Sequence, residues 1–237
     1  MTPTDANWWQ GRRALVTGAA GGIGGAAARR LHGLGATVLG VDITADPAAA
    51  FPMATADVSD RDQIGSVVRG FGDDGGLDVL VVSAAVYGDA VSIDELTPAD
   101  VERVLSVNIA GTLWTAQAAL PYLRESRGSI VAVGSLAGRM GGVLAGAHYA
   151  GSKGAVHSIV RSLAKTQAEY GVRANGVAPG AVDTPMVAGR GYHPEAFPQG
   201  RFATPDEIVD GIVFLAAPTA SYVNGVVLDV NGGLYVH

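Results

Sequence analysis

Short apolar runs alternate with longer amphipathic stretches along most of this chain. Apolar runs bounded by Gly, Pro, Asp or Asn are typical of strands buried on both faces of a parallel sheet. The stretches between them repeat apolar residues at helical spacing. This alternation predicts an α/β fold, a doubly wound parallel sheet with helices on both faces. About seven strands are expected, at residues 13–17, 37–41, 51–56, 77–82, 128–134, 173–178 and 226–230.

Two of the predicted helices have clear starting signals. Thr97 and Thr204 are each followed by Pro and then by an acidic residue in the first turn. The Thr hydroxyl can cap the helix, the Pro has a φ that suits the first turn, and the acid has a charge that is favourable there. Residues 183–203 are irregular and contain several Gly and Pro, which is typical of a lid or binding loop. Further helices are expected at residues 22–34, 60–71 and 149–170, and the helix that follows Thr97 is expected to run to residue 125.

The composition narrows the class of protein. With 237 residues, 48% apolar and 16% charged, the chain suits one tightly packed domain over residues 1–237. A net charge of −6 without a basic cluster argues against a nucleic-acid or anionic-membrane partner. The chain has no Cys, and its five His show no metal-ligand spacing, so no metal is expected. A cytoplasmic location is expected, because no signal core or run of eighteen apolar residues occurs.

A glycine-rich turn, Thr17-Gly18-Ala19-Ala20-Gly21-Gly22-Ile23-Gly24, joins the first strand to the first helix. Glycine allows the backbone to turn sharply and approach a diphosphate, whose charge then meets the N-terminus of the helix. The turn is not a P-loop, because no Lys follows the glycines, and it departs from the strict G-x-G-x-x-G spacing. It therefore indicates a dinucleotide site, although a plain tight turn would look similar.

Acidic residues follow the second and third strands. Asp42, eighteen residues after Gly24, can accept hydrogen bonds from both hydroxyls of an adenosine ribose, or can act as a cap or solvated residue. It would repel a 2′-phosphate by roughly 4 kcal/mol for charges about 4 Å apart at an effective dielectric near 20, close to three decades of preference for NAD over NADP. No Arg or Lys at positions 21, 43 or 44 compensates. Asp57 could meet the adenine amino group or cap the next helix.

Three polar positions carry candidate chemistry. Tyr149 and Lys153 are four residues apart on one face of a predicted helix, a pair expected by chance in about 0.06 such sequences. Ser135 follows the fifth strand, where open α/β sheets place ligands, but Val133 occupies the first glycine position of G-x-S-x-G, so no nucleophile elbow is predicted. Asn108 lies within an apolar helical series and is either a structural hydrogen-bonder or part of a site.

Together these features resemble the short-chain dehydrogenase/reductase family over essentially the whole chain. Residues 17–24 are similar to its Thr-Gly-x-x-x-Gly-x-Gly turn, and Tyr149 and Lys153 to its Tyr-x-x-x-Lys pair. The resemblance implies one Rossmann-type NAD-binding domain whose substrate loop lies at about 183–203. Further matching positions are Asn108, Ser135 and the Pro179-Gly180 turn.

One motif departs from the family pattern. Val82-Ser83-Ala84-Ala85 stands where the family commonly shows Asn-Asn-Ala-Gly. Val82 cannot make the side-chain bonds attributed to the first asparagine, and Ala85 places a methyl group where glycine admits the adenosine ribose. This difference from the family pattern is expected to affect the affinity for the cofactor, and it does not change the predicted fold.

The resemblance implies a mechanism in which Tyr149 exchanges a proton with a secondary alcohol or ketone while the nicotinamide exchanges hydride. A free phenol has a pKa near 10. Lys153 about 4 Å away, together with the oxidised nicotinamide, could contribute roughly 4 kcal/mol and bring that pKa near 7. Lys153 would also hold the nicotinamide ribose, Ser135 would donate to the substrate oxygen, and Asn108 would position a water linking Lys153 to solvent.

The resemblance also implies the cofactor contacts and the assembly. Val182 would meet the nicotinamide carboxamide through its backbone, with Thr184 near the same end. A homotetramer is implied, built by pairing the helices at 98–125 and 149–170. The residues implied in NAD binding are Gly18, Ala20, Gly22, Ile23, Gly24, Asp42, Asp57, Val58, Ala84, Ala85, Asn108, Tyr149, Lys153, Pro179, Gly180, Val182 and Thr184.

Several functions are compatible with this pattern. The first is an NAD-dependent oxidoreductase of a small-molecule secondary alcohol or ketone, with a 3-oxoacyl reductase or a dihydrodiol dehydrogenase as variants. A non-catalytic NAD-binding sensor is a second, which the intact Asn-Ser-Tyr-Lys set opposes. A nucleotide-sugar epimerase or dehydratase is disfavoured, because that branch spaces its glycines differently and needs a larger C-terminal region than 237 residues supply.

The remaining conspicuous side chains favour packing. Trp8 and Trp9 are expected to cover a sheet edge. His148 is expected in a loop or first helical turn, with a packing or surface role. An apolar substrate pocket could be walled by the 139–148 segment and by three residues of the 183–203 loop, Met186, Tyr192 and Phe197.

Overall fold

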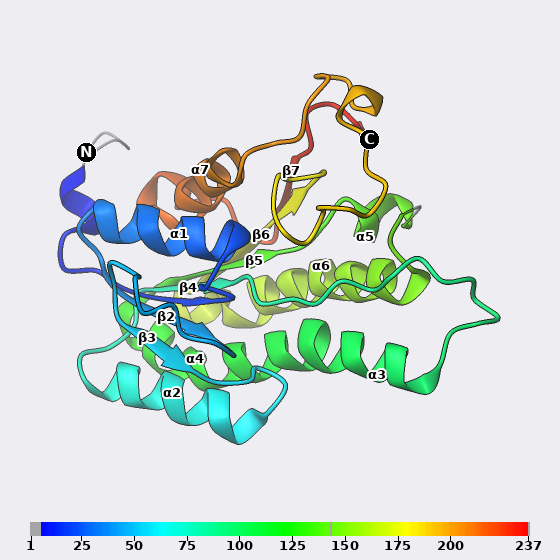
Figure 1. Cartoon of the computed structure of the whole chain (residues 1–237). Coiled ribbons are helices and arrows are strands. Elements are labelled where there is room, and N and C mark those ends of the chain that lie inside the picture. Colours follow the sequence, from blue (N-terminus) through cyan, green and yellow to red (C-terminus); the bar gives the residue numbers. More distant parts are fainter. Residues whose placement is uncertain (1–5, 143, 237) are drawn as a thin grey trace.

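The computed structural model describes residues 6–142 and 144–236. Within these residues, seven parallel strands form one sheet in the order β3-β2-β1-β4-β5-β6-β7, with helices on both faces (Figure 1). The predicted doubly wound sheet is confirmed. The strands are β1 Arg13–Thr17, β2 Thr37–Asp42, β3 Met53–Thr55, β4 Val79–Val82, β5 Ser129–Val133, β6 Arg173–Pro179 and β7 Val227–Val230.

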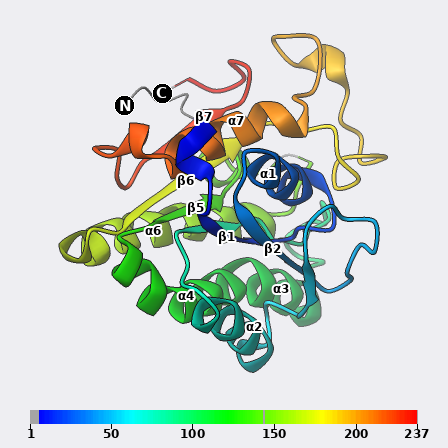
Figure 2. The same cartoon turned by 90° about the vertical axis from the view of Figure 1, so that its left-hand side faces the viewer.

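Two helical layers enclose the sheet, as Figure 2 shows from its end. One layer contains α1 and α7, and the other contains α2, α3, α4 and α6 (Figure 1). The helices are α1 Gly22–Gly33, α2 Arg61–Asp73, α3 Pro98–Leu105, α4 Thr112–Ser126, α5 Ala137–Met140, α6 Ala147–Gln167 and α7 Pro205–Ala216.

Alternating side chains of each strand supply two cores. In β1, Ala14 and Val16 pack on the side of α1 and α7, whereas Leu15 packs on the side of α2 and α4. This is the period of two that a strand imposes. Because both faces are covered, the strands are apolar nearly throughout, which is why they could be recognised as continuous apolar runs.

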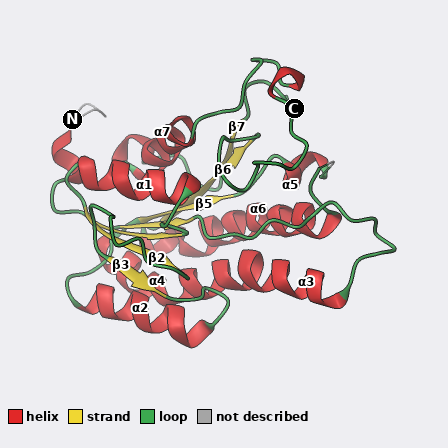
Figure 3. Ribbon diagram, in the orientation of Figure 1, coloured by secondary structure: helices red, strands yellow, loops and turns green. Residues whose placement is uncertain are grey.

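The strand order reverses between β1 and β4, which are neighbours although they are not consecutive strands. The crossovers therefore leave β1 in opposite directions, and a crevice opens at the carboxyl ends of the strands there. The long loop between β6 and α7 lies at this end of the molecule, near α5 (Figure 3). It contains only a short 3-10 turn, Pro194–Ala196, as a helical element within its described residues.

Helix starts agree with the sequence signals. Thr97 and Thr204 are N-caps of α3 and α7, and each forms a capping box with the acid three residues later. Each box satisfies two backbone N–H groups that the helix itself leaves unpaired. The single long helix expected at 98–125 is instead divided by a π-helical turn, Ser106–Gly111.

Two smaller differences concern short elements. The third strand covers only Met53–Thr55, within the expected 51–56, and α5 was not predicted. With four residues, α5 is too short for any apolar period to be seen in the sequence.

The N-terminal end of the described chain forms a 3-10 helix, Ala6–Trp9. Trp9 is buried in the core beneath α1 and α7, and Trp8 packs edge-on against it with ring centroids 4.5 Å apart. These tryptophans thus extend the core on this face rather than covering a sheet edge. No helix within the described ranges is long and apolar enough to cross a membrane.

Candidate active site

A cavity of about 900 Å³ opens at the carboxyl ends of the central strands. Its volume lies in the range of small-molecule sites. Every predicted site residue lines it except Ala20 and Asn108. The predicted walls from the loop and from the 139–148 segment are also present, through Met186, Tyr192 and Phe197 and through Met140, Gly141, Gly142, Leu144 and Ala145.

The glycine-rich turn is as tight as its composition suggests. Gly18 has φ +70°, and a Cβ there would lie 2.8 Å from the backbone nitrogen of Ala84. A Cβ on Gly24 would lie 2.2 Å from the carbonyl oxygen of Gly18. Helix α1 begins at Gly22, and its N-cap, Gly21, supplies no side-chain hydrogen bond; its first turn contains no acid. Its first N–H groups can therefore meet an anion, and the turn fits a dinucleotide diphosphate.

Replacing Gly18 with Ala is expected to lower the free energy of unfolding by about 1–3 kcal/mol, because a positive φ strains any side chain. The contact with Ala84 at 2.8 Å adds to this loss. Gly70→Ala is the matched control, since Gly70 lies inside α2 with nothing within 4 Å of an added Cβ. That control should raise stability by about 0.5–1 kcal/mol. Urea unfolding of both variants checks this, and equal stabilities would contradict it.

Asp42 is held at the edge of the cavity by the turn itself. Its Oδ2 accepts a hydrogen bond from the backbone nitrogen of Ala20 at 3.0 Å, and its Oδ1 accepts one from that of Ile43 at 2.8 Å. Ala20 therefore acts on the site by fixing this carboxylate. Among the described residues that line the cavity, Lys153 is the only Lys or Arg, so no cation at this edge offsets the charge of Asp42.

Asp57 also lines the cavity, at the end of β3. Its Oδ1 accepts hydrogen bonds from the backbone nitrogen and the hydroxyl of Ser59, at 2.8 and 2.7 Å. The N-cap of α2 is Asp60, whose carboxylate accepts from the backbone nitrogens of Asp62 and Gln63. The alternative that Asp57 caps this helix is therefore wrong, because Asp60 already does so.

The departure at the end of β4 is accommodated by Thr17. Its hydroxyl oxygen accepts hydrogen bonds from the backbone nitrogens of Ser83 and Ala84, at 3.1 and 3.2 Å. Val82 is buried in the core on the side of α2 and α4, and Ala85 presents its methyl group to the cavity. Thr17 thus holds the loop after β4 against the glycine turn without an asparagine at position 82.

Asn108 lies in the π-helical turn and is 1% exposed. Its Oδ1 accepts from the backbone nitrogen of Val86 at 2.9 Å, and its Nδ2 donates to the Val86 carbonyl and to the hydroxyl of Ser152. Ser152 in turn donates to the carbonyl of Tyr149 at 2.7 Å. Both amide protons are thereby used on protein groups, so Asn108 ties the loop after β4 to the turn of α6 that bears Tyr149. The expected role of Asn108 in positioning a water linked to Lys153 stays a prediction, for which the second lone pair of its Oδ1 is available.

Tyr149 and Ser135 meet inside the cavity. The Ser135 hydroxyl accepts from the backbone nitrogen of Ala137 at 3.1 Å and lies close enough to the Tyr149 phenol to lower its pKa. Burial raises the pKa of Tyr149 to about 12, and the hydrogen bond from Ser135 offsets only part of that rise.

Lys153 lies beside Tyr149 and is also bonded to the sheet. Its Nζ donates to the carbonyl of Val133 at 2.9 Å and lies 5.8 Å from the centroid of the Tyr149 ring. The amine is 4% exposed, and burial lowers its pKa to about 8. Among the chain's own groups, burial of the phenol dominates the pKa of Tyr149, and the value near 7 expected with the oxidised nicotinamide beside it stays a prediction.

Two site-adjacent residues were missed in the sequence. The Nε2 of His157 accepts from the backbone nitrogen of Ser135 at 3.4 Å, and burial lowers the pKa of His157 to about 4, so the ring is neutral. Its spacing of four residues from Lys153 on α6 could have indicated this position. Tyr87 lines the cavity with its ring centroid 5.1 Å from that of Tyr149, and no motif marks it.

His148 is the second residue of α6 and is buried. Neither ring nitrogen has a hydrogen-bond partner among the described residues. Added Cβ atoms on Gly88 and Gly146 would each lie 2.4 Å from its ring. The expected place in a first helical turn and the packing role are thus observed.

An open parallel sheet, a glycine turn at the first crossover and a Tyr-Lys pair in one cavity define a dinucleotide-binding α/β protein. The family model described as enoyl-(acyl carrier protein) reductase matches residues 18–235. The chain is 37% identical to cis-4-hydroxycyclohexanecarboxylate dehydrogenase of Sinomonas cyclohexanicum, over 94% of this chain and 96% of that protein. It is 35% identical to 3-oxoacyl-acyl-carrier-protein reductase of Thermotoga maritima, over 96% and 99%.

A solved structure agrees with these relatives. The 3-ketoacyl-acyl-carrier-protein reductase of Brucella melitensis, in complex with NADH, superposes with a TM-score of 0.90 and 28% identity, over 96% of this chain and all of that chain. The chain belongs to the short-chain dehydrogenase/reductase family. It is an oxidoreductase of the nicotinamide-dependent kind.

Proposed function

We propose that this protein interconverts a secondary alcohol and a ketone by hydride transfer with NAD, using Tyr149 as the general acid and base. The observation that carries the proposal is the convergence of Tyr149, Ser135 and Lys153 on one cavity that also contains the glycine turn. Groups placed in this way can act on one substrate oxygen.

Each side chain has a distinct part in the proposed reaction. Tyr149 accepts the proton of the alcohol hydroxyl in oxidation and returns it to the ketone oxygen in reduction. Ser135 donates to the same oxygen and keeps it against the phenol. Asn108 positions Tyr149 through Ser152. The bound nicotinamide supplies the hydride exchange and, when oxidised, a positive charge.

Lys153 provides the second positive charge. Its ammonium has three protons, of which one is used on the carbonyl of Val133. The other two can bond the nicotinamide ribose and approach the phenol, and both effects lower the pKa of Tyr149 from about 12 toward the working range.

The choice of NAD is supported by Asp42 and by the residues around it. The carboxylate is fixed by Ala20 and Ile43. It would accept hydrogen bonds from a free ribose and repel a 2′-phosphate. At the other end, Pro179, Gly180, Val182 and Thr184 line the cavity where the nicotinamide would lie.

A substrate screen tests this function. The protein is mixed with NAD and a panel of secondary alcohols, or with NADH and ketones, and absorbance of the reduced cofactor is followed. Turnover supports the proposal, and a ternary crystal structure should then show the substrate oxygen at Tyr149 and Ser135. Cofactor binding without turnover would favour a non-catalytic NAD sensor.

A second candidate is a 3-oxoacyl reductase. The Thermotoga maritima relative and the Brucella melitensis structure carry such names, and the substrate end of this cavity has apolar walls that would suit an acyl chain. Acetoacetyl thioesters with NADH or NADPH distinguish it, since a dedicated acyl reductase would prefer them strongly over free cyclic ketones.

We propose that four copies assemble through α4 and α6. Leu113 on α4 is 41% exposed, and Gly151 on α6 has nothing within 4 Å of an added Cβ, so both helices have surfaces that another backbone can approach. Sedimentation should give a mass of about 4 × 24.0 kDa. A species of 24.0 kDa would contradict the assembly.

A further inference from the structure

Three tyrosines from separate segments converge at the substrate end of the cavity. They are Tyr149 on α6, Tyr87 on the loop after β4, and Tyr192 on the loop between β6 and α7, and all three line the cavity. The rings of Tyr87 and Tyr149 pack with centroids 5.1 Å apart. The hydroxyls of Tyr87 and Tyr192 are 3.1 Å apart.

The hydrogen-bond chain through these hydroxyls has a fixed direction. The Tyr87 hydroxyl is bonded to the carbonyl of Leu144, and a carbonyl can only accept. The single proton of Tyr87 is therefore used on Leu144. Tyr192 must then be the donor in its bond with Tyr87, because each phenol has only one proton. Toward a ligand, the oxygen of Tyr192 can therefore only accept a hydrogen bond.

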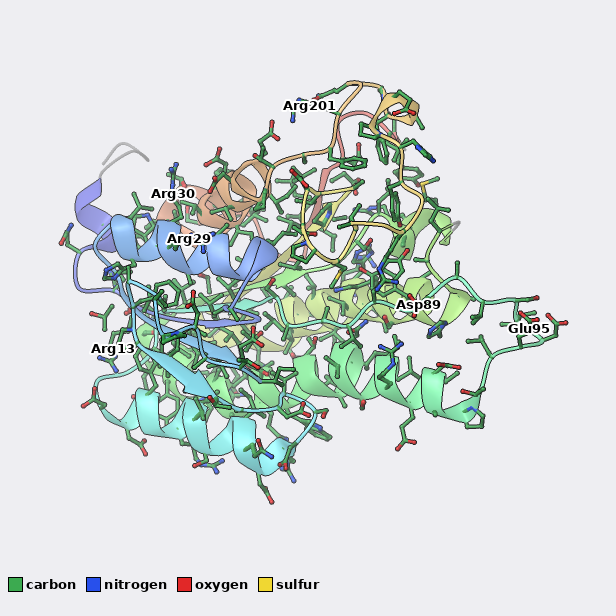
Figure 4. All side chains as sticks on the ribbon, viewed as in Figure 1. Arg13, Arg29, Arg30, Asp89, Glu95 and Arg201 are labelled. Atoms are coloured by element: carbon green, nitrogen blue, oxygen red, sulfur yellow. The ribbon has the colours of Figure 1, made fainter. Side chains whose placement is uncertain are left out.

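The direction of this chain is stable because Tyr87 stays protonated. Burial raises the pKa of Tyr87 well above its usual value. The Arg190 guanidinium packs over the Tyr87 ring at 4.4 Å, but it is paired with Asp89 and does not line the cavity. Asp89 lies on the loop after β4 (Figure 4). This ion pair holds the 183–203 loop to that loop without presenting a free cation to a substrate.

The surroundings of Tyr192 are otherwise apolar. Tyr192 packs in one cluster with Ala145 and Met186, and Leu144 and Met186 also line the cavity. A polar substituent placed there would meet the Tyr192 oxygen as an acceptor, and would lose water without compensation unless it could donate. A carboxylate has no proton to give, and an ether oxygen or ketone would face lone pairs.

We propose that Tyr192, with its proton held by Tyr87, is a specificity-determining residue that selects substrates with a second, non-reacting hydroxyl group. The preferred class is then a diol in oxidation and a hydroxyketone in reduction. The second hydroxyl donates to Tyr192 while the reacting one is bound by Tyr149 and Ser135. This inference rests on the proposed dehydrogenase function and specifies its substrate class.

Three alcohols and three variants test the proposal. kcat/KM is measured with NAD for cyclohexane-1,2-diol, for 2-methoxycyclohexanol, which can only accept at the second position, and for cyclohexanol as the reference. The native protein should prefer the diol over cyclohexanol by about fivefold to tenfold, the worth of one neutral hydrogen bond. Tyr192→Phe should abolish that preference, so that the ratio of kcat/KM for the diol to that for cyclohexanol falls to about one.

Tyr87→Phe separates this role from a purely structural one. This variant frees the Tyr192 proton, which can then be donated to an ether oxygen. The kcat/KM of the methoxy compound should therefore rise relative to that of the diol. Loosening of the loop alone would not reverse the preference in this way. Tyr222→Phe is the control, because Tyr222 is fully exposed at 101%. The ratios of kcat/KM among the three alcohols should stay unchanged in this variant. Equal kcat/KM for diol and ether in the native protein, or an unchanged diol preference in Tyr192→Phe, would overturn the inference. Failure to oxidise any of the three would overturn the dehydrogenase function as well.

Discussion

Replacing Tyr149 with Phe is expected to lower kcat/KM for alcohol oxidation by about 10³-fold or more, because the group that takes the substrate proton is removed. The phenyl ring still fills the same space against Tyr87. The protein should therefore unfold at an unchanged urea concentration and bind NAD with unchanged affinity. Steady-state kinetics, urea unfolding and a fluorescence titration with NADH measure these three quantities.

The pH dependence of the oxidation rate is a second test of the role of Tyr149. The chain's own groups raise the pKa of Tyr149 to about 12, and Lys153 keeps its charge below its pKa of about 8. The phenolate fraction therefore rises with pH while the cation that supports it is still present, so the native oxidation rate should increase with pH up to about 8. The residual rate of Tyr149→Phe should lack that rise. Near-normal turnover of this variant would remove Tyr149 from the mechanism.

Most of the fold could be predicted because its signals are local. The strands β1, β4, β5 and β6 are buried on both faces and read as apolar runs. The starts of α3 and α7 depend on residues within one turn. The glycine turn and the pair Tyr149 and Lys153 are also contained in single segments. Such features need no knowledge of which distant residues will meet.

Several of the missed features depend on contacts between distant segments, whereas α5 was missed because it has only four residues. The π-helical turn arises where Asn108 reaches Val86 and Ser152, and nothing in 98–125 alone marks that break. Lys153 bonds Val133 because β5 passes beside α6 in the folded state. The sequence placed this amine near the phenol but could not show that the Val133 carbonyl takes one of its protons.

The substrate end illustrates the same limit. Tyr192 was recognised as a possible wall of an apolar pocket, with packing of the loop as the commoner role of such an aromatic residue. The direction of its hydrogen bond depends on Tyr87 and Leu144, which are 105 and 48 residues away along the chain. Only the assembled structure shows that the proton of Tyr192 is already used, and hence what chemistry it can recognise.

Replacing Asp42 with Ala is expected to change the coenzyme preference by about two to three orders of magnitude. In the native protein the carboxylate should favour NAD over NADP by up to about 10³, the effect of roughly 4 kcal/mol of repulsion at an effective dielectric near 20. Asp42→Ala removes both the repulsion and the bonds to the ribose, so kcat/KM should fall with NAD and rise with NADP. The ratio of the two values, measured with the same alcohol, is the test.

Two further variants separate charge from hydrogen bonding. Asp42→Asn keeps an oxygen that can accept from Ala20 while removing the charge, so it should lose the discrimination against NADP with a smaller loss of NAD activity. Asp57→Asn is the matched control, because Asp57 lines the same cavity but bonds Ser59 rather than the glycine turn. Asp42 is only half-buried, so salt should screen its repulsion of a 2′-phosphate. The native preference for NAD over NADP should therefore become smaller as the salt concentration is raised, whereas the hydrogen bonds to the ribose should not weaken. A native preference for NADP would overturn the role assigned to Asp42 and would leave the role of Tyr149 untouched.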